Sequence, residues 1–175
     1  MTELYHVVTG RMMEQGQLLK LDDEHPNGVC LRVRALERLE RGEDPGELGE
    51  LIRGDVERWK CVARREEALE RVRLSEFPEH PSRLCCLYAS RTLDEARSWA
   101  SYFSELGRDV LAIVRLKALG SVFTGDACNC FDGTGDRATD DELARRYWLA
   151  LPTGKPVMET LVAGDTLVDE IIERF

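Results

Sequence analysis

The hydrophobic residues of the central part of the chain change spacing within a short stretch. Residues 84–89 form a short apolar run, the length of a buried strand. Apolar residues then recur every three or four positions over residues 93–103, which is typical of one face of a helix. Thr92 and Glu95 have the spacing of a capping box at the start of this helix, and Gly107 lies where such helices end. The stretch therefore predicts a core strand that leads directly into an amphipathic helix.

Four other segments have the composition of strands. Residues 3–8 and 157–163 are short apolar runs, and residues 110–116 alternate between apolar and polar side chains. Residues 166–172 predict a last strand or a short helix. Between these strands, residues 120–141 are rich in Gly, Asp and Cys and predict a loop.

The remaining segments are highly charged and helical in pattern. Residues 29–41 predict one helix and residues 47–74 a second, with an apolar stripe and Glu–Arg pairs on the opposite face. Thr139 and Glu142 have capping-box spacing and predict a short helix. Together, the elements predict a single α+β domain over residues 1–175, with a helical insertion at about 29–74.

The charge balance limits the classes of partner. The net charge is −9 at pH 7, which argues against a nucleic acid bound through its phosphates, although a whole-chain balance does not exclude a local basic patch. No apolar run approaches the roughly 20 residues of a membrane helix. The first ten residues lack the pattern of a signal peptide. We therefore expect a cytoplasmic protein that does not enter a membrane.

The six cysteines do not predict a metal site. The only close spacing outside the Cys85-Cys86 pair is Cys128-Asn129-Cys130, whereas structural zinc sites usually contain two C-x-x-C pairs. Aspartates in the loop at 125–141 are reminiscent of calcium sites, but their spacing does not match an EF-hand. We expect reduced thiols and no metal.

Three polar residues lie inside apolar strand segments: His6, Tyr88 and Glu159. Each has an ordinary structural interpretation. His6 would be a hydrogen-bonded core histidine, Tyr88 a core side chain, and Glu159 a residue on the solvent side of an edge strand. A buried carboxylate such as that of Glu159 needs a reason, because burying it unpaired is costly. Taken together, the order of the three residues along the chain and the elements that carry them favour a functional interpretation.

In this arrangement the chain resembles the ADP-ribosyltransferase superfamily, in the branch with a His–Tyr–Glu triad. The resemblance rests on Leu4-Tyr5-His6 in the first strand, on Cys86-Leu87-Tyr88-Ala89-Ser90 before a helix, and on Glu159-Thr160-Leu161-Val162 in a late strand. The segments Phe77-Pro78 and Pro81-Ser82-Arg83 also resemble a bacterial family that is known as a domain of unknown function.

The resemblance implies a split, strongly bent antiparallel sheet and NAD as substrate. It implies that Glu159 is the catalytic residue, holding the ribose 2′-hydroxyl and stabilising an oxocarbenium-like transition state. Tyr88 and His6 would bind NAD, through stacking on nicotinamide and a hydrogen bond to the adenosine ribose. The ADP-ribose would pass to an unknown acceptor, such as a protein, or to water.

The chain departs from the family pattern at Val157 and in the first strand, where Val7-Val8-Thr9-Gly10 follows His6 without the small residues common in the family. Val157 stands where the arginine-modifying toxins have an acidic or amide residue, so that activity is not implied. The segment 126–156, which often selects the acceptor in the superfamily, is acidic and unusual here. The alternative is a catalytically inactive binding module on the same fold. An RNA 2′-phosphotransferase-like activity is disfavoured, because such a site needs several basic residues.

Overall fold

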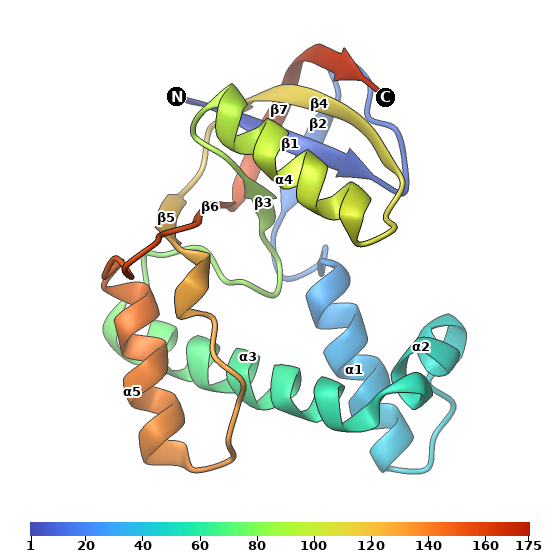
Figure 1. Ribbon diagram of the computed structural model, residues 1–175, viewed down its shortest axis with the longest axis vertical. Coiled ribbons are helices and arrows are strands. Elements are labelled where there is room, and N and C mark those ends of the chain that lie inside the picture. Colours follow the sequence, from blue (N-terminus) through green and yellow to red (C-terminus); the bar gives the residue numbers. More distant parts are fainter.

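The computed structural model describes residues 1–175 as two antiparallel sheets and five α-helices (Figure 1). The strands are β1 (Thr2–Thr9), β2 (Leu18–Leu21), β3 (Leu87–Ala89), β4 (Val110–Ala118), β5 (Val122–Asp126), β6 (Met158–Val162) and β7 (Gly164–Arg174). The helices are α1 (Gly28–Glu40), α2 (Gly49–Gly54), α3 (Val56–Glu76), α4 (Leu93–Glu105) and α5 (Arg137–Trp148), with 3-10 turns at Gly46–Leu48 and Ala127–Asn129. This mixture confirms the predicted α+β class.

The two sheets are connected by a pair of chain segments that cross between them side by side. One sheet has the strand order β1-β4-β7-β2 and the other β3-β6-β5. The chain passes from β4 into β5 and from β6 into β7, and the backbone of Leu119 bonds that of Asp165 where these segments meet. Gly120 is required at this crossing, because a Cβ atom there would lie 2.0 Å from the carbonyl oxygen of Ala163.

Alternation along β1 sends its side chains to two different layers. Val7 packs with Ala96 of α4, which covers the outer face of the four-stranded sheet. Leu4 and Val8 point the other way and pack with Val162 of the three-stranded sheet. The first sheet is therefore buried on both faces near β1.

The remaining helices form a separate lobe below the sheets in Figure 1. Helices α3 and α5 pack against each other and against the three-stranded sheet, where Leu161 of β6 belongs to a cluster that includes Leu69 and Trp148. Helix α1 packs on α3 and α2. Helix α3 is the longest at 21 residues and is rich in Glu and Arg, and no helix of the protein combines the length and apolar character needed to cross a bilayer.

Several predicted elements are confirmed. Strands β1, β4 and β6 lie where the apolar pattern indicated, and the last segment is a strand, β7. Helix α4 begins with the complete capping box of Thr92 and Glu95, and Gly107 has φ = 74° as expected after its end. Local sequence rules succeed at these places because the residues that set the boundary lie next to it.

Other predictions were wrong, and each for a physical reason. The predicted strand at 84–89 pairs only over β3, because residues 81–86 form a buried turn. The predicted helix at 47–74 breaks at Asp55, whose carboxylate caps α3. The supposed loop at 120–141 contains β5, and residues 11–28 contain the unpredicted β2. Helix α5 is capped by Asp136 instead of Thr139.

Candidate functional site

Tyr88 and Glu159 lie on one face of the three-stranded sheet. Tyr88 in β3 pairs with Leu161 in β6, and Glu159 is two residues before Leu161, so alternation sends both side chains toward the helical lobe. Strand β6 is the central strand of this sheet, and Glu159 is buried at 8% exposure. The interpretation of Glu159 as a solvent-facing residue on an edge strand is therefore wrong.

His6 reaches this region from the other sheet. Its neighbour Tyr5 forms an isolated antiparallel bridge with Ser90, just after β3. This bridge brings the His6 ring to the backbone of Tyr88, where Nδ1 lies 2.7 Å from the carbonyl oxygen. His6 thus contacts the Tyr88 backbone and not the Tyr88 ring, and no hydrogen bond joins His6 to Glu159.

Arg83, which is buried at 5% exposure, connects Glu159 to Tyr147 and Glu66. Its Nη1 donates to Glu159 Oε1 at 2.6 Å and to the hydroxyl oxygen of Tyr147 at 2.6 Å. Its Nε donates to Glu66 Oε2 at 3.0 Å. Burial alone would lower the pKa of Arg83, but the charge of Glu66 and its other neighbours raises it well above the usual value. Arg83 therefore stays charged between two carboxylates.

Glu66 is the most buried of these charges, at 1% exposure on α3. Its second oxygen, Oε1, accepts from Nε of Arg65 at 3.0 Å. Two arginines, Arg65 and Arg83, thus face two carboxylates, Glu66 and Glu159. Such balance is what makes buried ionic groups tolerable, because each lost hydration shell is replaced by a partner of opposite charge.

Two tyrosine rings lie close to the Arg83 guanidinium. Its Cζ lies 4.9 Å from the ring centre of Tyr147 and 5.3 Å from that of Tyr88, within range of cation–π attraction. Burial raises the pKa of both phenols well above the usual value, so both hydroxyls keep their protons. The hydroxyl of Tyr88 donates to the carbonyl oxygen of Arg83, and that of Tyr147 donates to Glu159 Oε1 at 2.8 Å.

The two oxygens of Glu159 have different surroundings. Oε1 accepts from Arg83 and Tyr147, and the thiol of Cys130 lies 3.8 Å away. Burial raises the pKa of that thiol to about 11, so it remains protonated. Oε2 has no hydrogen-bond partner. It is also not sealed from solvent, because Thr166 Oγ1 is the only fully buried side-chain nitrogen or oxygen atom that lacks a partner. Oε2 is therefore oriented by the bonds to Oε1 and remains open to a ligand.

The protonation of His6 follows from its contact. Burial lowers the pKa of His6, an effect that the bond to the Tyr88 carbonyl opposes only in part. A carbonyl oxygen only accepts, so Nδ1 carries the proton and donates. In the neutral ring, Nε2 is then a free acceptor, suited to a hydroxyl group of a ligand.

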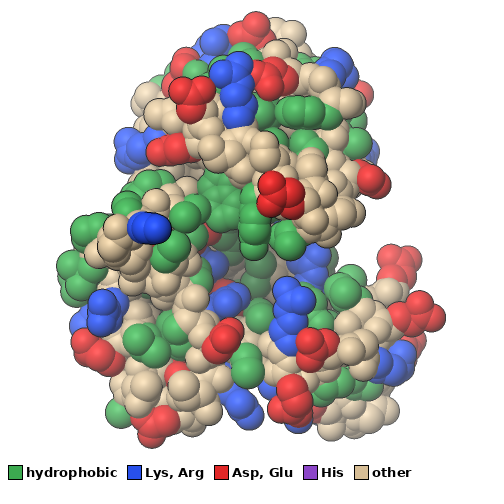
Figure 2. Space-filling view, viewed as in Figure 1, with side chains coloured by type: hydrophobic (Ala, Val, Ile, Leu, Met, Phe, Trp, Pro, Cys, Tyr) green, Lys and Arg blue, Asp and Glu red, His purple; other side chains and the backbone are tan.

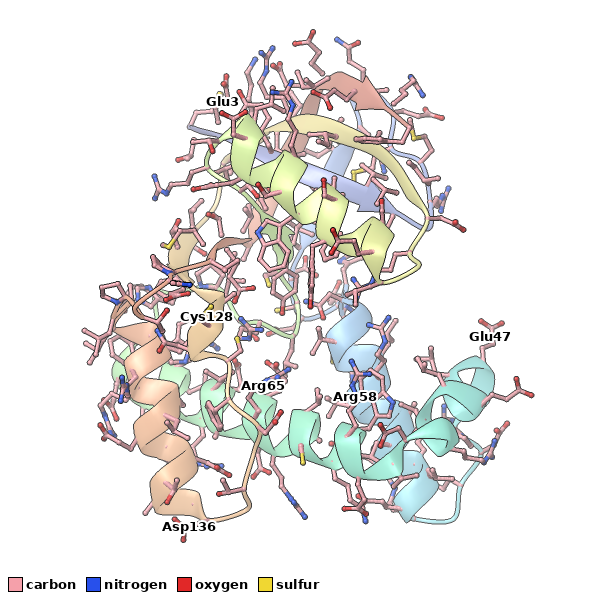
Figure 3. The ribbon with its side chains drawn as sticks, viewed as in Figure 1. Glu3, Glu47, Arg58, Arg65, Cys128 and Asp136 are labelled. Atoms are coloured by element: carbon pink, nitrogen blue, oxygen red, sulfur yellow. The ribbon has the colours of Figure 1, made fainter.

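Figure 2 shows a hollow in the middle of this face of the molecule, between the upper part that contains α4 and the helical lobe below. Hydrophobic side chains gather along its upper part, and Lys or Arg side chains lie along its lower wall. Figure 3 shows Arg65 on the side of α3 that faces this hollow. A groove of about 930 Å³ lies elsewhere, between α1 and α3, and none of His6, Tyr88 and Glu159 lines it. We place the candidate site by its converging chemical groups and not by cavity size.

The aspartates of the segment 125–141 serve the backbone. Asp126 accepts from the backbone N–H groups of Cys128, Thr153 and Val157. Asp140 accepts three times from Thr134 and Gly135, so it anchors the turn before α5. No group of three His, Cys, Asp or Glu side chains in the protein has the arrangement of a metal site.

Sequence reasoning did not identify Arg83, Glu66 and Tyr147 as members of the site. A signal existed for two of them. Glu66 occupies the apolar stripe of α3, four residues after Val62 and three before Leu69, where a carboxylate is out of place. Arg83 directly precedes the apolar run at residues 84–89, where a charged residue is also noticeable. Neither signal names the partner, because the contacts join residues 17 and 76 positions apart.

The comparisons with known proteins identify a family without an assigned activity. No curated protein matches the chain. The family described as "Protein of unknown function (DUF2441)" matches residues 4–174, nearly the whole sequence. The chain therefore belongs to the DUF2441 family.

Proposed function

We propose that this protein binds NAD in the hollow beside Glu159 and cleaves its glycosidic bond, passing ADP-ribose to an acceptor or to water. The observation that carries the proposal is the asymmetric carboxylate of Glu159. One oxygen is fixed by Arg83 and Tyr147, and the other is free. A fixed carboxylate with one open oxygen suits the stabilisation of positive charge that develops on a ribose, because it needs no reorganisation.

The neighbours of Glu159 fit the same ligand. The ring of Tyr88 lies on the same face of the sheet and would stack on nicotinamide. The neutral ring of His6 would accept a bond from a ribose hydroxyl through Nε2. The resemblance to the ADP-ribosyltransferase superfamily assigns these roles, and the division into two bent antiparallel sheets is compatible with it.

In the proposed reaction, the bond between nicotinamide and the ribose carbon breaks, and its electron pair leaves with the neutral nicotinamide. The free oxygen of Glu159 holds the ribose 2′-hydroxyl while positive charge grows on the sugar. A hydroxyl, amine or water of the acceptor then forms the new bond to the ribose carbon and releases one proton. The acceptor class stays open in this proposal.

A second candidate is a catalytically inactive binding module. The observation that favours it is the internal balance of the cluster, in which Arg65 and Arg83 already neutralise Glu66 and Glu159. Such a network also serves to fix the turn at residues 81–86 against α3 without any ligand. On this interpretation the fold presents a surface, and Glu159 is part of its scaffold.

Incubation with NAD labelled in the adenosine part separates the two candidates. We expect free nicotinamide to appear, with the label on ADP-ribose when the protein is alone or on an acceptor when cell lysate is added. Calorimetric titration with NAD supplies the binding arm. Absence of both heat and nicotinamide release at millimolar NAD would reject the enzyme and leave the binding module.

A further inference from the structure

Three arginines that come together between α1, α3 and the end of α4 have no carboxylate partner. Arg32 on α1, Arg58 on α3 and Arg108 after α4 take part in none of the ion pairs of the protein. The chain has 33 acidic and 24 basic residues, so carboxylates are in excess. Other arginines, such as Arg34 and Arg64, also lack a partner, but these three lie close to one another, and it is their proximity that calls for an explanation.

Arg32 and Arg58 share one aromatic ring. Their Cζ atoms lie 5.8 and 5.7 Å from the ring centre of Trp59. The ring itself is held by a bond from its Nε1 to the carbonyl oxygen of Leu51 at 3.3 Å. Arg32 is also anchored by a bond from Nη1 to the carbonyl oxygen of Gly28 at 3.0 Å. The two guanidinium groups are therefore held in place by the helical lobe.

Arg108 approaches from the opposite lobe. Gly107 adopts φ = 74°, which turns the chain back at the end of α4. The backbone N–H of Arg108 then bonds the carbonyl oxygen of Phe103, and its Cζ lies 4.8 Å from the Phe103 ring. Burial lowers the pKa of Arg32, and the positive charge of Arg108 lowers it further, so the two guanidinium groups repel each other.

The figures agree with this arrangement. Figure 3 shows Arg58 above α3 and beside α1, on the side that faces α4. In Figure 2, Lys and Arg side chains lie on both sides of the end of the hollow nearest α1. Gathering like charges without a counter-ion costs free energy, and a bound anion removes that cost.

We propose that Arg32, Arg58 and Arg108 form a binding site for the phosphate group of a small ligand. Guanidinium groups match phosphate oxygens with paired N–H donors, and three of them suit a group that carries more than one negative charge. The site joins the two lobes, because Arg108 comes from the α4 side and the other two from the helical lobe.

The site lies within reach of Glu159. Asn27 caps α1 and donates to the carbonyl oxygens of Arg83 and Cys86, so α1 begins beside the candidate site. Arg32 is five residues further along, about 7.5 Å at the rise of an α-helix. One ligand can therefore extend from the arginines to the carboxylate. The diphosphate of NAD is one source of the phosphate, and a separate phosphate-bearing ligand is the other.

Inorganic pyrophosphate is the probe for this site. We expect calorimetric binding by the intact protein at low ionic strength, with affinity that falls as salt is added. R32Q and R108Q should each weaken binding about tenfold or more, because each removes charge-assisted hydrogen bonds. R34Q is the matched control, since Arg34 lies on the same helix, is exposed and is unpaired, and it should bind like the parent.

The outcomes separate this site from the proposed function. E159Q should bind pyrophosphate like the parent, so the site stands even if NAD is not cleaved. Displacement of pyrophosphate by NAD would identify the dinucleotide as the source, and NAD binding without displacement would identify a second ligand. Equal weakening by R34Q and R32Q, or no binding of pyrophosphate at millimolar concentration, would overturn the proposal.

Discussion

Arg83 and Glu159 form a buried ion pair, with 2.6 Å between Nη1 and Oε1, that leaves the other carboxylate oxygen of Glu159 free. The pair connects the turn before β3 to β6, the central strand of the three-stranded sheet, 76 positions later in the chain. The same contact thus has a structural consequence, since it ties the turn to the sheet, and a chemical one, since it fixes one oxygen of the Glu159 carboxylate and leaves the other without a partner.

The substitution E159Q tests the chemical consequence. Glutamine keeps the size of the side chain and one acceptor oxygen but removes the charge. If Glu159 stabilises an oxocarbenium-like transition state, nicotinamide release should fall about 100- to 1000-fold while NAD affinity changes little. Single-turnover rates and calorimetric titration with NAD measure the two quantities.

E47Q is the matched control for this charge change. Glu47 lies at the far end of the helical lobe (Figure 3) and is exposed. It should leave both rate and affinity unchanged. A Glu159→Gln protein that melts several degrees lower but releases nicotinamide at the parent rate would remove Glu159 from the active site.

The substitution R83Q tests the structural consequence. It leaves Glu66 and Glu159 buried with less compensation, and breaking a buried ionic network by removing one partner typically costs about 3–5 kcal/mol. We therefore expect a large fall in the free energy of unfolding, measured by urea denaturation. R145Q breaks the exposed pair with Glu76 and should have a much smaller effect. Similar losses for the two variants would contradict the importance of the buried network.

The sequence predicts those parts of the site that follow from local patterns, and it does not predict contacts between residues that are far apart in the chain. His6, Tyr88 and Glu159 were noticed because each interrupts an apolar strand, and strand alternation is a local rule. Alternation does not tell which face of a strand is covered, so it left Glu159 open between the core and the solvent. That choice is made by α5, which brings Tyr147 to the carboxylate.

The same limit explains the fold errors. The capping box of α4 was correct because Thr92 and Glu95 bond each other's backbone. The equally spaced Thr139 and Glu142 were misleading, since Asp136 caps α5 and Asp140 is used by Thr134 and Gly135. A local motif predicts a boundary only where no competing acceptor lies nearby.

His6 should make the stability of the protein depend on pH on the acid side of neutrality. Its pKa in the folded state is lowered from 6.5, first by burial, so between 6.5 and the lowered value the unfolded chain binds a proton that the folded chain does not. Stability from this residue is complete above pH 6.5 and decreases as the pH falls below it.

The measurement is urea denaturation of the parent and H6Q over this pH range. Glutamine keeps a side-chain N–H for the Tyr88 carbonyl but does not titrate, so the parent should lose stability relative to H6Q below pH 6.5. H25Q changes an exposed histidine that bonds Asp22 and should keep the parent's acid loss. Parallel curves for the parent and H6Q would contradict a lowered pKa.

Asp126 should contribute a second pH dependence, in stronger acid. Burial alone would raise the pKa of Asp126, but hydrogen bonds from Thr153 and from the backbone of Val157 and Cys128 lower it from 3.8 to about 2. A group with a lowered pKa stabilises the fold above its unfolded value, and this stabilisation is lost as the pH falls from 3.8 toward 2. The bonds join the end of β5 to the segment before β6. Their loss therefore also weakens the attachment of the segment that leads into β6, the strand that contains Glu159.

D126N separates this contribution from general acid unfolding. The amide keeps one acceptor oxygen but replaces the other with a donor that faces backbone N–H groups, so the variant should be less stable than the parent at pH 7. The difference should shrink as the pH approaches 2, where the parent carboxylate is also protonated. D132N, at an exposed position in the same segment, should follow the parent throughout. A difference between D126N and the parent that stays constant from pH 7 to pH 2 would show that the carboxylate charge is not what stabilises this segment.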